Sequence, residues 1–319
     1  MKIRLALAGW LMAITTLSLA QTWPAQTIKI VVPFTPGTGM DTIARTVAPK
    51  LSERLGQTVV VQNVPGASGN IGADNVAKAN PDGYTLLMGA NTMLMAAQLY
   101  KNVSFNPVDD FASVSMVAYG TLMLVASPKS GIKSMQDLMT LAKAKPGFVS
   151  YGSPGIGTPH HMAMELFKSE AQLTLLHVPY KGTSGFVQDL LAGELMVGFL
   201  PVHVAQNFVS TGKLVALAVG GAARHPVAPS VATIQELGVN GVNVDIWYAF
   251  FAPAKTPALV SNRLNTEIVA IMNLPEVKSV LTHAGLDAMS STSSELNVML
   301  KKDYLRWGSV IKRNAIEIN

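Results

Sequence analysis

The sequence contains no cysteine, and this absence excludes several kinds of chemistry. A chain without thiols forms no disulfide bond, holds no metal through thiolates and has no cysteine nucleophile. Charged residues are also scarce, at 13% of the 319 residues, and they are spread evenly along the chain. Because no cluster of Lys and Arg is interleaved with aromatic residues, we expect no nucleic-acid partner.

Recognisable catalytic motifs are missing as well. The segments 152–155 (Gly-Ser-Pro-Gly) and 182–185 (Gly-Thr-Ser-Gly) lack the Gly-x-Ser-x-Gly spacing of a nucleophile elbow, and no phosphate-binding loop ends in Gly-Lys-Ser/Thr. His161 and Glu165 lie one helical turn apart beside His160, but no third ligand that would complete a metal site is evident. We therefore expect no metal, no cofactor and no catalytic residue.

Long apolar runs occur only at the N-terminus. Lys2 and Arg4 precede the mostly apolar residues 5–17 and the small-residue segment 18–20, a pattern typical of a secretory signal peptide cleaved near Ala20. The apolar run is too short for a membrane anchor, and no later segment approaches eighteen apolar residues. Removing two of the 24 basic residues leaves 22 against 19 acidic ones, a formal charge of +3. Residues 1–20 thus predict export, and an exported chain without disulfides suits the bacterial periplasm.

The rest of the chain alternates short apolar runs with segments of helical periodicity. Short links between them predict an α/β fold with a mostly parallel sheet covered by helices on both faces. The expected strands are 27–32, 58–61, 84–88, 122–126, 149–151, 175–179, 196–200, 214–219 and 247–251. The expected helices are 41–55, 71–79, 93–99, 134–144 and 186–192, one that starts at 256–257, and a last one with Leu296, Leu300, Tyr304 and Trp307 on one side.

One loop, residues 33–41, connects the first strand to the first helix and carries two prolines and two glycines. This layout places free backbone N–H groups and the positive end of a helix in front of a ligand. Gly37 and Gly39 can take a positive φ and let a ligand approach the backbone. We interpret the loop as a binding site for an anion, most simply a carboxylate; an ordinary strand-to-helix connection remains the alternative.

A second loop of the same kind follows the strand at 149–151. Residues 152–161 (Gly-Ser-Pro-Gly-Ile-Gly-Thr-Pro-His-His) lead into another helix, about 120 residues after the first loop. A small anion held between the two loops would explain why the pattern occurs twice. His161 is expected either to hydrogen-bond its own loop at the helix start or to contact the ligand directly.

Several motifs in order resemble the Bug/TctC family, the periplasmic solute-binding receptors of tripartite tricarboxylate transporters. The likeness begins with Val-Pro-Phe-Thr-Pro-Gly-Thr-Gly-Met-Asp at 32–41 and covers essentially the whole chain after the signal peptide. It continues through the segments 55–73, 81–89, 177–182, 212–219 and 251–257.

The resemblance implies a two-domain type II periplasmic binding protein, a hinged "Venus flytrap" with the ligand in the cleft between domains. Domain 1 is expected to comprise residues 21–122 and 240–319, and domain 2 residues 123–239. By position in the family's loops, the implied ligand-binding residues are Phe34, Thr35, Gly37, Thr38, Gly39, Asp41, Asn91, Thr92, Ser153, Gly157, Thr158, His161, Lys181 and Leu200.

Three positions depart from the family pattern. Thr38 stands where a second consecutive glycine is usual, and His160 stands where a small hydroxyl residue is usual. Leu200 stands where many members carry Asp, so an acidic partner for a ligand ammonium is missing. We therefore expect no amino-acid ligand, and an apolar Leu200 in the cleft would suit an aliphatic dicarboxylate or an aromatic carboxylate.

The resulting hypothesis is a monomeric periplasmic receptor and not an enzyme. It would capture a small organic carboxylate, either a di- or tricarboxylate or an aromatic carboxylate, and deliver it to the membrane subunits of a tripartite tricarboxylate transporter. Two alternatives remain: a periplasmic sensor that reports the same ligand to a signalling partner, and a secreted hydrolase that uses Ser153, His161 or Lys181. Neighbouring genes for the membrane subunits would separate receptor from sensor.

Overall fold

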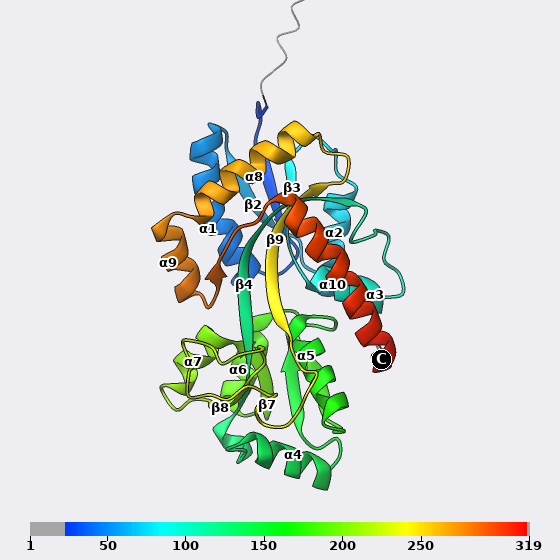
Figure 1. Cartoon of the computed structure of the whole chain (residues 1–319), viewed down its shortest axis with the longest axis vertical. Coiled ribbons are helices and arrows are strands. Elements are labelled where there is room, and N and C mark those ends of the chain that lie inside the picture. Colours follow the sequence, from blue (N-terminus) through cyan, green and yellow to red (C-terminus); the bar gives the residue numbers. More distant parts are fainter. Residues whose placement is uncertain (1–22, 318–319) are drawn as a thin grey trace, which may run out of the picture.

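Two long strands run side by side through the middle of the molecule and connect its two lobes (Figure 1). They are β4 (Phe111–Ala126) and β9 (Asp245–Pro253), which pair antiparallel. The structure is a computed structural model that describes residues 23–317. The expected signal peptide, residues 1–20, lies outside the described residues.

The first lobe contains the N-terminal end of the described chain and the last helix, whose C-terminal end reaches the second lobe through the contacts of Arg313 with Glu170 and of Asn314 with Ser169. Its other strands are β1 (Ile28–Val32), β2 (Val59–Asn63), β3 (Thr85–Ala90) and β10 (Asp287–Ala288). Its helices are α1 (Gly39–Leu55), α2 (Asn70–Ala77), α3 (Thr92–Leu99), α8 (Ala258–Met272), α9 (Pro275–His283) and α10 (Ser293–Arg313), with a 3-10 turn at Ala67–Gly69.

The second lobe is built from the middle of the chain. Its strands are β5 (Ser150–Ser153), β6 (Leu176–Pro179), β7 (Val197–Pro201) and β8 (Val215–Val219). Its helices are α4 (Met135–Ala144), α5 (Pro159–Glu170), α6 (Thr183–Ala192) and α7 (Val202–Val209), and a 3-10 turn lies at Pro128–Ser130.

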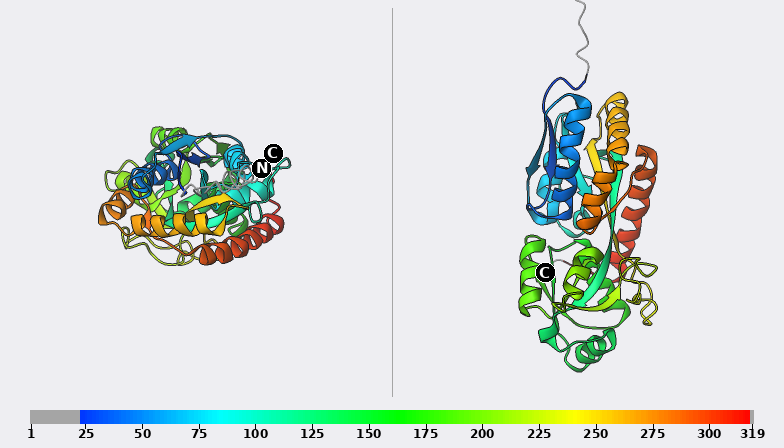
Figure 2. Two further views of the ribbon diagram at one scale, coloured as in Figure 1. Left: turned by 90° about the horizontal axis from the view of Figure 1, so that it is seen from above. Right: turned by 90° about the vertical axis from the view of Figure 1, so that its left-hand side faces the viewer.

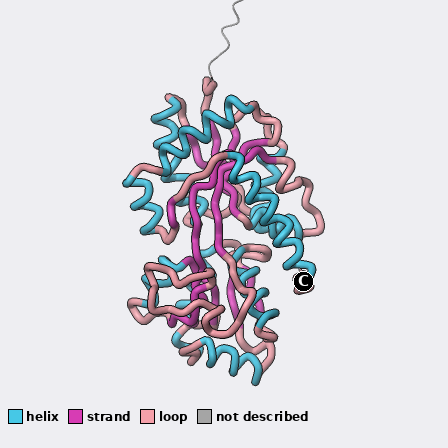
Figure 3. The backbone as a smooth tube through the Cα atoms, in the orientation of Figure 1, coloured by secondary structure: helices cyan, strands magenta, loops and turns pink. Residues whose placement is uncertain are grey.

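The strands follow the order β2-β1-β3-β9-β4-β7-β5-β6, with β8 and β10 paired to β4 outside this path. β4 exchanges partners along its length: residues 111–121 pair with β9, and residues 122–126 pair with β7 and β8. The tube drawing shows β4 running from one lobe into the other (Figure 3). The expected parallel units are present, since β1 pairs parallel with β2 and β3, and β5 with β6 and β7. The antiparallel pairs of β4 and β9 make the sheet mixed.

Alternation along the strands explains why helices cover both faces of the sheet in the first lobe. Ile30 and Leu86 belong to the core cluster that includes α1 and α8, whereas Val31 and Leu87 belong to the cluster that includes α2, α3 and α10. Two views at right angles show these two helical layers with the strands between them (Figure 2). None of the helices within residues 23–317 is long and apolar enough to cross a membrane.

Local signals in the sequence set several helix ends. Thr38, Ser134 and Thr158 are the N-caps of α1, α4 and α5, and each side-chain oxygen accepts a backbone N–H from the first turn. Gly56 ends α1 in the left-handed conformation, with φ of +66°. These elements match the expected ones closely because a cap is a short-range feature.

Four elements were not expected from the sequence: the first two-thirds of β4, the helices α7 and α9, and the two-residue strand β10. Residues 111–121 include small and polar side chains such as Ser113, Ser115 and Gly120, so they show no apolar alternation. Their strand conformation comes from pairing with β9, which lies about 130 residues later in the chain.

A buried hydrogen bond joins β9 to the outer helix α10. The indole Nε1 of Trp247 donates to Oδ2 of Asp303 at 2.8 Å, and both residues are buried. A buried donor that loses its acceptor costs more than the bond itself contributes, whereas removing both partners is nearly neutral.

We predict that Asp303→Leu lowers the free energy of unfolding by about 1–3 kcal/mol, because the indole N–H is left without an acceptor. The double variant Trp247→Phe/Asp303→Leu should recover part of that loss, since no orphaned donor remains. Urea denaturation of the parent, both single variants and the double variant measures these effects. A double variant that is less stable than Asp303→Leu by the full cost of Trp247→Phe would contradict the assignment.

Candidate functional site

The first loop leads from β1 into α1 and is closed by the side chain of Asp41. The N–H of Gly37 donates to Oδ2 of Asp41 at 3.0 Å, and Oγ1 of Thr38 accepts the N–H of Asp41 at 3.4 Å. Gly37 has φ of +84°, a conformation that favours glycine. The loop therefore folds back onto the first turn of α1.

Asp41 is held as a carboxylate by three neighbours. Nε of Arg45 lies 3.0 Å from both carboxylate oxygens, and Nδ2 of Asn63 donates to Oδ1 at 2.9 Å. Burial alone would raise the pKa of Asp41, but the hydrogen bonds from Arg45, Gly37 and Asn63 outweigh it and hold the pKa below the ordinary value of 3.8. Nδ2 of Asn63 also donates to the carbonyl of Phe34 at 3.0 Å, which ties the loop to β2.

The second loop repeats this arrangement with a histidine in place of the aspartate. The N–H of Gly157, at φ of +77°, donates to Nδ1 of His161 at 3.2 Å, and Oγ1 of Thr158 accepts the N–H of His161 at 3.5 Å. Burial, helped by the nearby charge of Lys168, lowers the pKa of His161 to about 3. The imidazole is therefore neutral, as an acceptor at Nδ1 has to be. The first of the two roles expected for His161, bonding its own loop, is the one observed.

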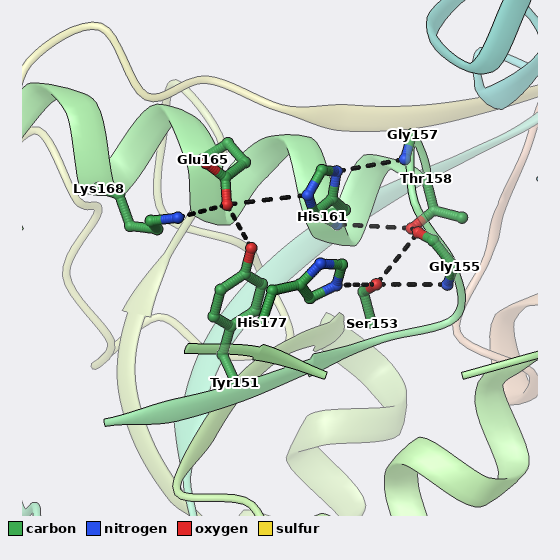
Figure 4. Close-up of polar contacts among 9 residues, drawn as sticks. All are labelled: Tyr151, Ser153, Gly155, Gly157, Thr158, His161, Glu165, Lys168 and His177. Carbon is green, nitrogen blue, oxygen red and sulfur yellow. Dashed lines mark hydrogen bonds and ion pairs between the residues drawn. The ribbon is translucent and has the colours of Figure 1, made fainter. Parts of the chain in front are cut away.

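A network of polar side chains supports the second loop from behind (Figure 4). The ring of His177 stacks between those of His161 and Tyr151, with centroid distances of 4.3 and 4.6 Å. Nε2 of His177 lies 2.7 Å from Oγ of Ser153, whose hydroxyl also contacts both backbone groups of Gly155.

The same network ends in a partly buried carboxylate on α5. Glu165 accepts a hydrogen bond from the Tyr151 hydroxyl and pairs with Nζ of Lys168 at 2.7 Å. Through these contacts the polar groups of the network are paired with one another. Ser153 is fully buried, and its hydroxyl contacts both the ring of His177 and the backbone of Gly155.

Both loops line one cavity of about 50 Å³ between the lobes. This is room for several water molecules. Of the residues that line it, three come from the start of α1 and three from the start of α5. The lining residues are Phe34, Thr38, Gly39, Met40, Thr92, Pro154, Thr158, Pro159, His160, Thr183, Ile246 and Tyr248.

Four helices begin at this cavity. Besides α1 and α5, Thr92 is the first residue of α3 and Thr183 is the first residue of α6. Within residues 23–317, the backbone N–H groups of Gly39, Met40 and His160 have no acceptor. No Lys, Arg, Asp or Glu is among the lining residues, all of which are described. Helix N-termini with free N–H groups attract an anion, so the cavity can hold a small anionic group without a cationic side chain.

A larger cavity of about 460 Å³ shares Phe34 and Pro154 with the small one. Thr35 and Lys181 line it, together with the 3-10 turn that precedes α2. Lys181 is exposed, so a ligand in this space would meet its ammonium group near water.

The structure sorts the expected site residues other than Leu200 into four groups. Phe34, Thr38, Gly39, Thr92 and Thr158 line the small cavity, and Phe34, Thr35 and Lys181 line the larger one. Gly37, Asp41, Ser153, Gly157 and His161 shape the two loops. Asn91 is buried before α3, where its Nδ2 donates to the carbonyl of Asp245 at 2.7 Å.

The expectation that Leu200 lies in the cleft is wrong. Its side chain is fully buried and packs with Met123, Phe186 and Val202 in the core of the second lobe. Leu200 pairs with Met123 of β4 in the sheet, and the alternation of side chains directs it into that core. The apolar body of a ligand therefore does not meet Leu200.

Seven cavity residues were not among the expected site residues: Met40, Pro154, Pro159, His160, Thr183, Ile246 and Tyr248. Met40, Pro154, Pro159 and His160 belong to the two loops that the sequence singled out. Ile246 and Tyr248 lie in an apolar strand whose sequence predicts core packing, and nothing in that sequence indicates that they line a cavity. Among the described residues no group of three or more His, Asp or Glu could hold a metal ion.

We predict that Asp41→Asn lowers stability at pH 7 by about 1 kcal/mol, because the charged acceptor of Arg45 is lost. A lowered folded-state pKa adds stability that is present above the unfolded pKa, near 3.9, and is lost as the pH falls through the folded value. The difference between the variant and the parent should therefore begin to shrink near pH 4 and go on shrinking as the pH falls through the lower folded value. Urea denaturation from pH 7 to pH 3 measures it; a difference that is constant with pH would contradict the role of the charge.

Comparisons with known proteins agree with this geometry. The family model described as "Tripartite tricarboxylate transporter family receptor" (TctC) matches residues 43–316. A Pseudomonas sp. (strain P51) relative, "UPF0065 protein in tcbD-tcbE intergenic region", is 36% identical over 321 residues, which cover 99% of this chain and 96% of the relative.

Solved structures resemble the whole fold. An R. palustris protein solved with adipate is 31% identical and superposes with a TM-score of 0.86 over 92% of this chain and 99% of the other. MatC from Rhodopseudomonas palustris, solved with bound malate, is 27% identical with a TM-score of 0.84 over 90% and 99% of the two chains. Two-domain periplasmic binding proteins share this α/β fold. The chain belongs to the TctC family of periplasmic solute-binding receptors, as its sequence motifs predicted.

Proposed function

We propose that this protein captures a small organic carboxylate between its two lobes and delivers it to the membrane subunits of a tripartite tricarboxylate transporter. The observation that carries the proposal is the meeting of four helix N-termini at one cavity that lacks charged side chains. A carboxylate is small, planar and anionic, and it accepts several N–H bonds at once.

The proposed mechanism depends on contributions from both lobes. α1 and α3 belong to the first lobe, and α5 and α6 to the second, so a bound carboxylate joins two bodies. A ligand that touches both bodies binds the closed arrangement better than an open one, and it shifts the population toward closure. The membrane partner would then recognise the closed surface.

The proposed hinge lies where β4 changes partners, between Thr121 and Leu122. Domain 1 would comprise residues 21–122 and 240–319, and domain 2 residues 123–239. Phe34, Thr38, Gly39, Thr92 and Thr158 are the proposed ligand contacts among the expected residues, and Thr35 and Lys181 would flank the entrance.

Relatives support the ligand class and the role as a receptor. Two of the similar structures contain the carboxylic acids adipate and malate, and the family is one of receptors rather than enzymes. We further propose export through residues 1–20, action as a monomer in the periplasm, and no metal or cofactor.

A thermal-shift screen of the mature protein from Gln21 tests the function. Di- and tricarboxylates, aromatic carboxylates and amino acids form the panel. We expect one carboxylate class to raise the melting temperature progressively with concentration, because a ligand of the folded state adds RT ln(1 + [L]/Kd), and amino acids to have no effect. Refolded protein serves as the control for a co-purified ligand. Stabilisation by amino acids alone, or silence after refolding, would contradict the proposal.

Gly39→Ala tests the position of the ligand. A Cβ at Gly39 would lie 3.0 Å from Oη of Tyr248, so it takes space from the cavity. We expect roughly tenfold weaker binding, or about 1.4 kcal/mol. Stability should change little, because the better helix propensity of Ala is opposed by the tight contact with Tyr248.

Thr42→Ala is the matched control, because Thr42 lies in the same helix and does not line the cavity. Isothermal calorimetry with the acid found in the screen, together with the melting temperature, separates the two effects. Equal affinities for Gly39→Ala and Thr42→Ala would place the ligand elsewhere.

A further inference from the structure

His160, the second residue of α5, combines burial with a lack of partners. The residue is 8% exposed, and neither Nδ1 nor Nε2 has a hydrogen-bond partner among the described residues. The ring makes a T-shaped contact with Phe186, with centroids 6.4 Å apart. A phenyl ring has no nitrogen or oxygen atom to offer, so both imidazole nitrogens are left without a partner.

This histidine also lines the small cavity. Two other buried polar side chains there have partners: Thr38 accepts the N–H of Asp41, and Thr158 donates to the carbonyl of Gly155 at 2.7 Å. Among the lining residues, His160 alone has buried side-chain nitrogen or oxygen atoms without a partner. Such a group destabilises the fold unless another molecule satisfies it, because its hydration is lost without replacement.

The chemistry of the ring limits what it can bind. Burial lowers the pKa of His160 to about 4, so the ring is neutral near pH 7 and offers one N–H donor and one lone pair. A ligand hydroxyl or a second carboxyl group can use that donor. A ligand ammonium would find no carboxylate in the lining to balance its charge.

From this geometry we infer that His160 is a specificity-determining residue, whose ring hydrogen-bonds a second oxygen-bearing group of the ligand. The inference rests on the proposed function, in which the first carboxylate lies at the helix N-termini. The substrate class is then a short acid with a second oxygen function, that is, a dicarboxylate or a hydroxy acid. Plain monocarboxylates are rejected, because they leave the buried ring unpaired.

Calorimetry with acids of matched length tests the inference. One set is succinate, 4-hydroxybutyrate and butyrate; the other is adipate, 6-hydroxyhexanoate and hexanoate. The parent protein should bind the better oxygen-bearing acid of a set on the order of 100-fold more tightly than the plain acid, since buried polar groups reject analogues that leave them unpaired. Within each set, the affinities for the dicarboxylate and the hydroxy acid show whether His160 binds a carboxyl group or a hydroxyl group.

His160→Leu should reduce that ratio to within about tenfold, because an apolar side chain no longer distinguishes the acids. The ligand-free variant should melt at the same temperature as the parent or higher, since two unpaired buried nitrogens have been removed. His160→Gln, which retains one amide donor, should keep part of the ratio. His283→Leu, at an exposed histidine of α9, is the matched control and should change neither the ratio nor the order of the acids.

The outcomes separate the inference from the function on which it rests. A ratio that stays the same in His160→Leu overturns the inference and leaves carboxylate binding intact. A variant that loses melting temperature and affinity for all acids alike shows a structural role for the ring, which also overturns it. Refolded parent protein that binds none of the six acids or the wider panel overturns the proposed function itself.

Discussion

The site depends on one local interaction that occurs once in each lobe: a glycine N–H bonded to the side chain four residues later. Gly37 donates to Asp41 and Gly157 donates to His161. Each bond folds a loop back onto a helix start, so that the next residues present their N–H groups to the cavity instead of to the loop. A threonine between the two partners caps the same helix in both cases. The two lobes thus build half a site each by the same means.

The charges are arranged so that the cavity itself stays neutral. The carboxylate of Asp41 would repel an anion, but behind the loop it accepts hydrogen bonds from Arg45, Asn63 and Gly37. Helix N-termini carry only partial positive charge, and each contributes modestly near a partly buried anion. Several such ends are needed to offset the hydration that a carboxylate loses. Because they come from both lobes, the closure that we propose would bring the full set together and so couple binding to closure.

Short-range features of the fold and site could be read from the sequence, and long-range ones could not. Both loops were identified, because Gly, Pro and a capping Thr are local signals, and five of the expected residues line the cavity. Tyr248 was missed because its strand reads as core; only pairing with β3 and β4 brings it opposite Gly39. Leu200 was misplaced because neighbouring residues of a strand face opposite sides. The first part of β4 lacks alternation, since it is buried by partners far away in the chain.

The use of Asp in one loop and His in the other gives the lobes different responses to acid. Asp41 stays ionised below its ordinary pKa of 3.8, so the first loop keeps its carboxylate acceptor until strongly acidic conditions. In the second lobe, burial lowers the pKa values of His160, His161 and His177 to between about 3 and 4. Each of these rings takes up a proton more readily in the unfolded chain than in the folded protein. Above about pH 6.5 the rings are neutral in both states, and the free energy of unfolding declines as the pH falls from there toward the folded pKa values. Protonation of His161 at Nδ1 would also remove the acceptor of Gly157. We therefore expect the stability linked to the second loop to begin declining at a higher pH than that linked to the first.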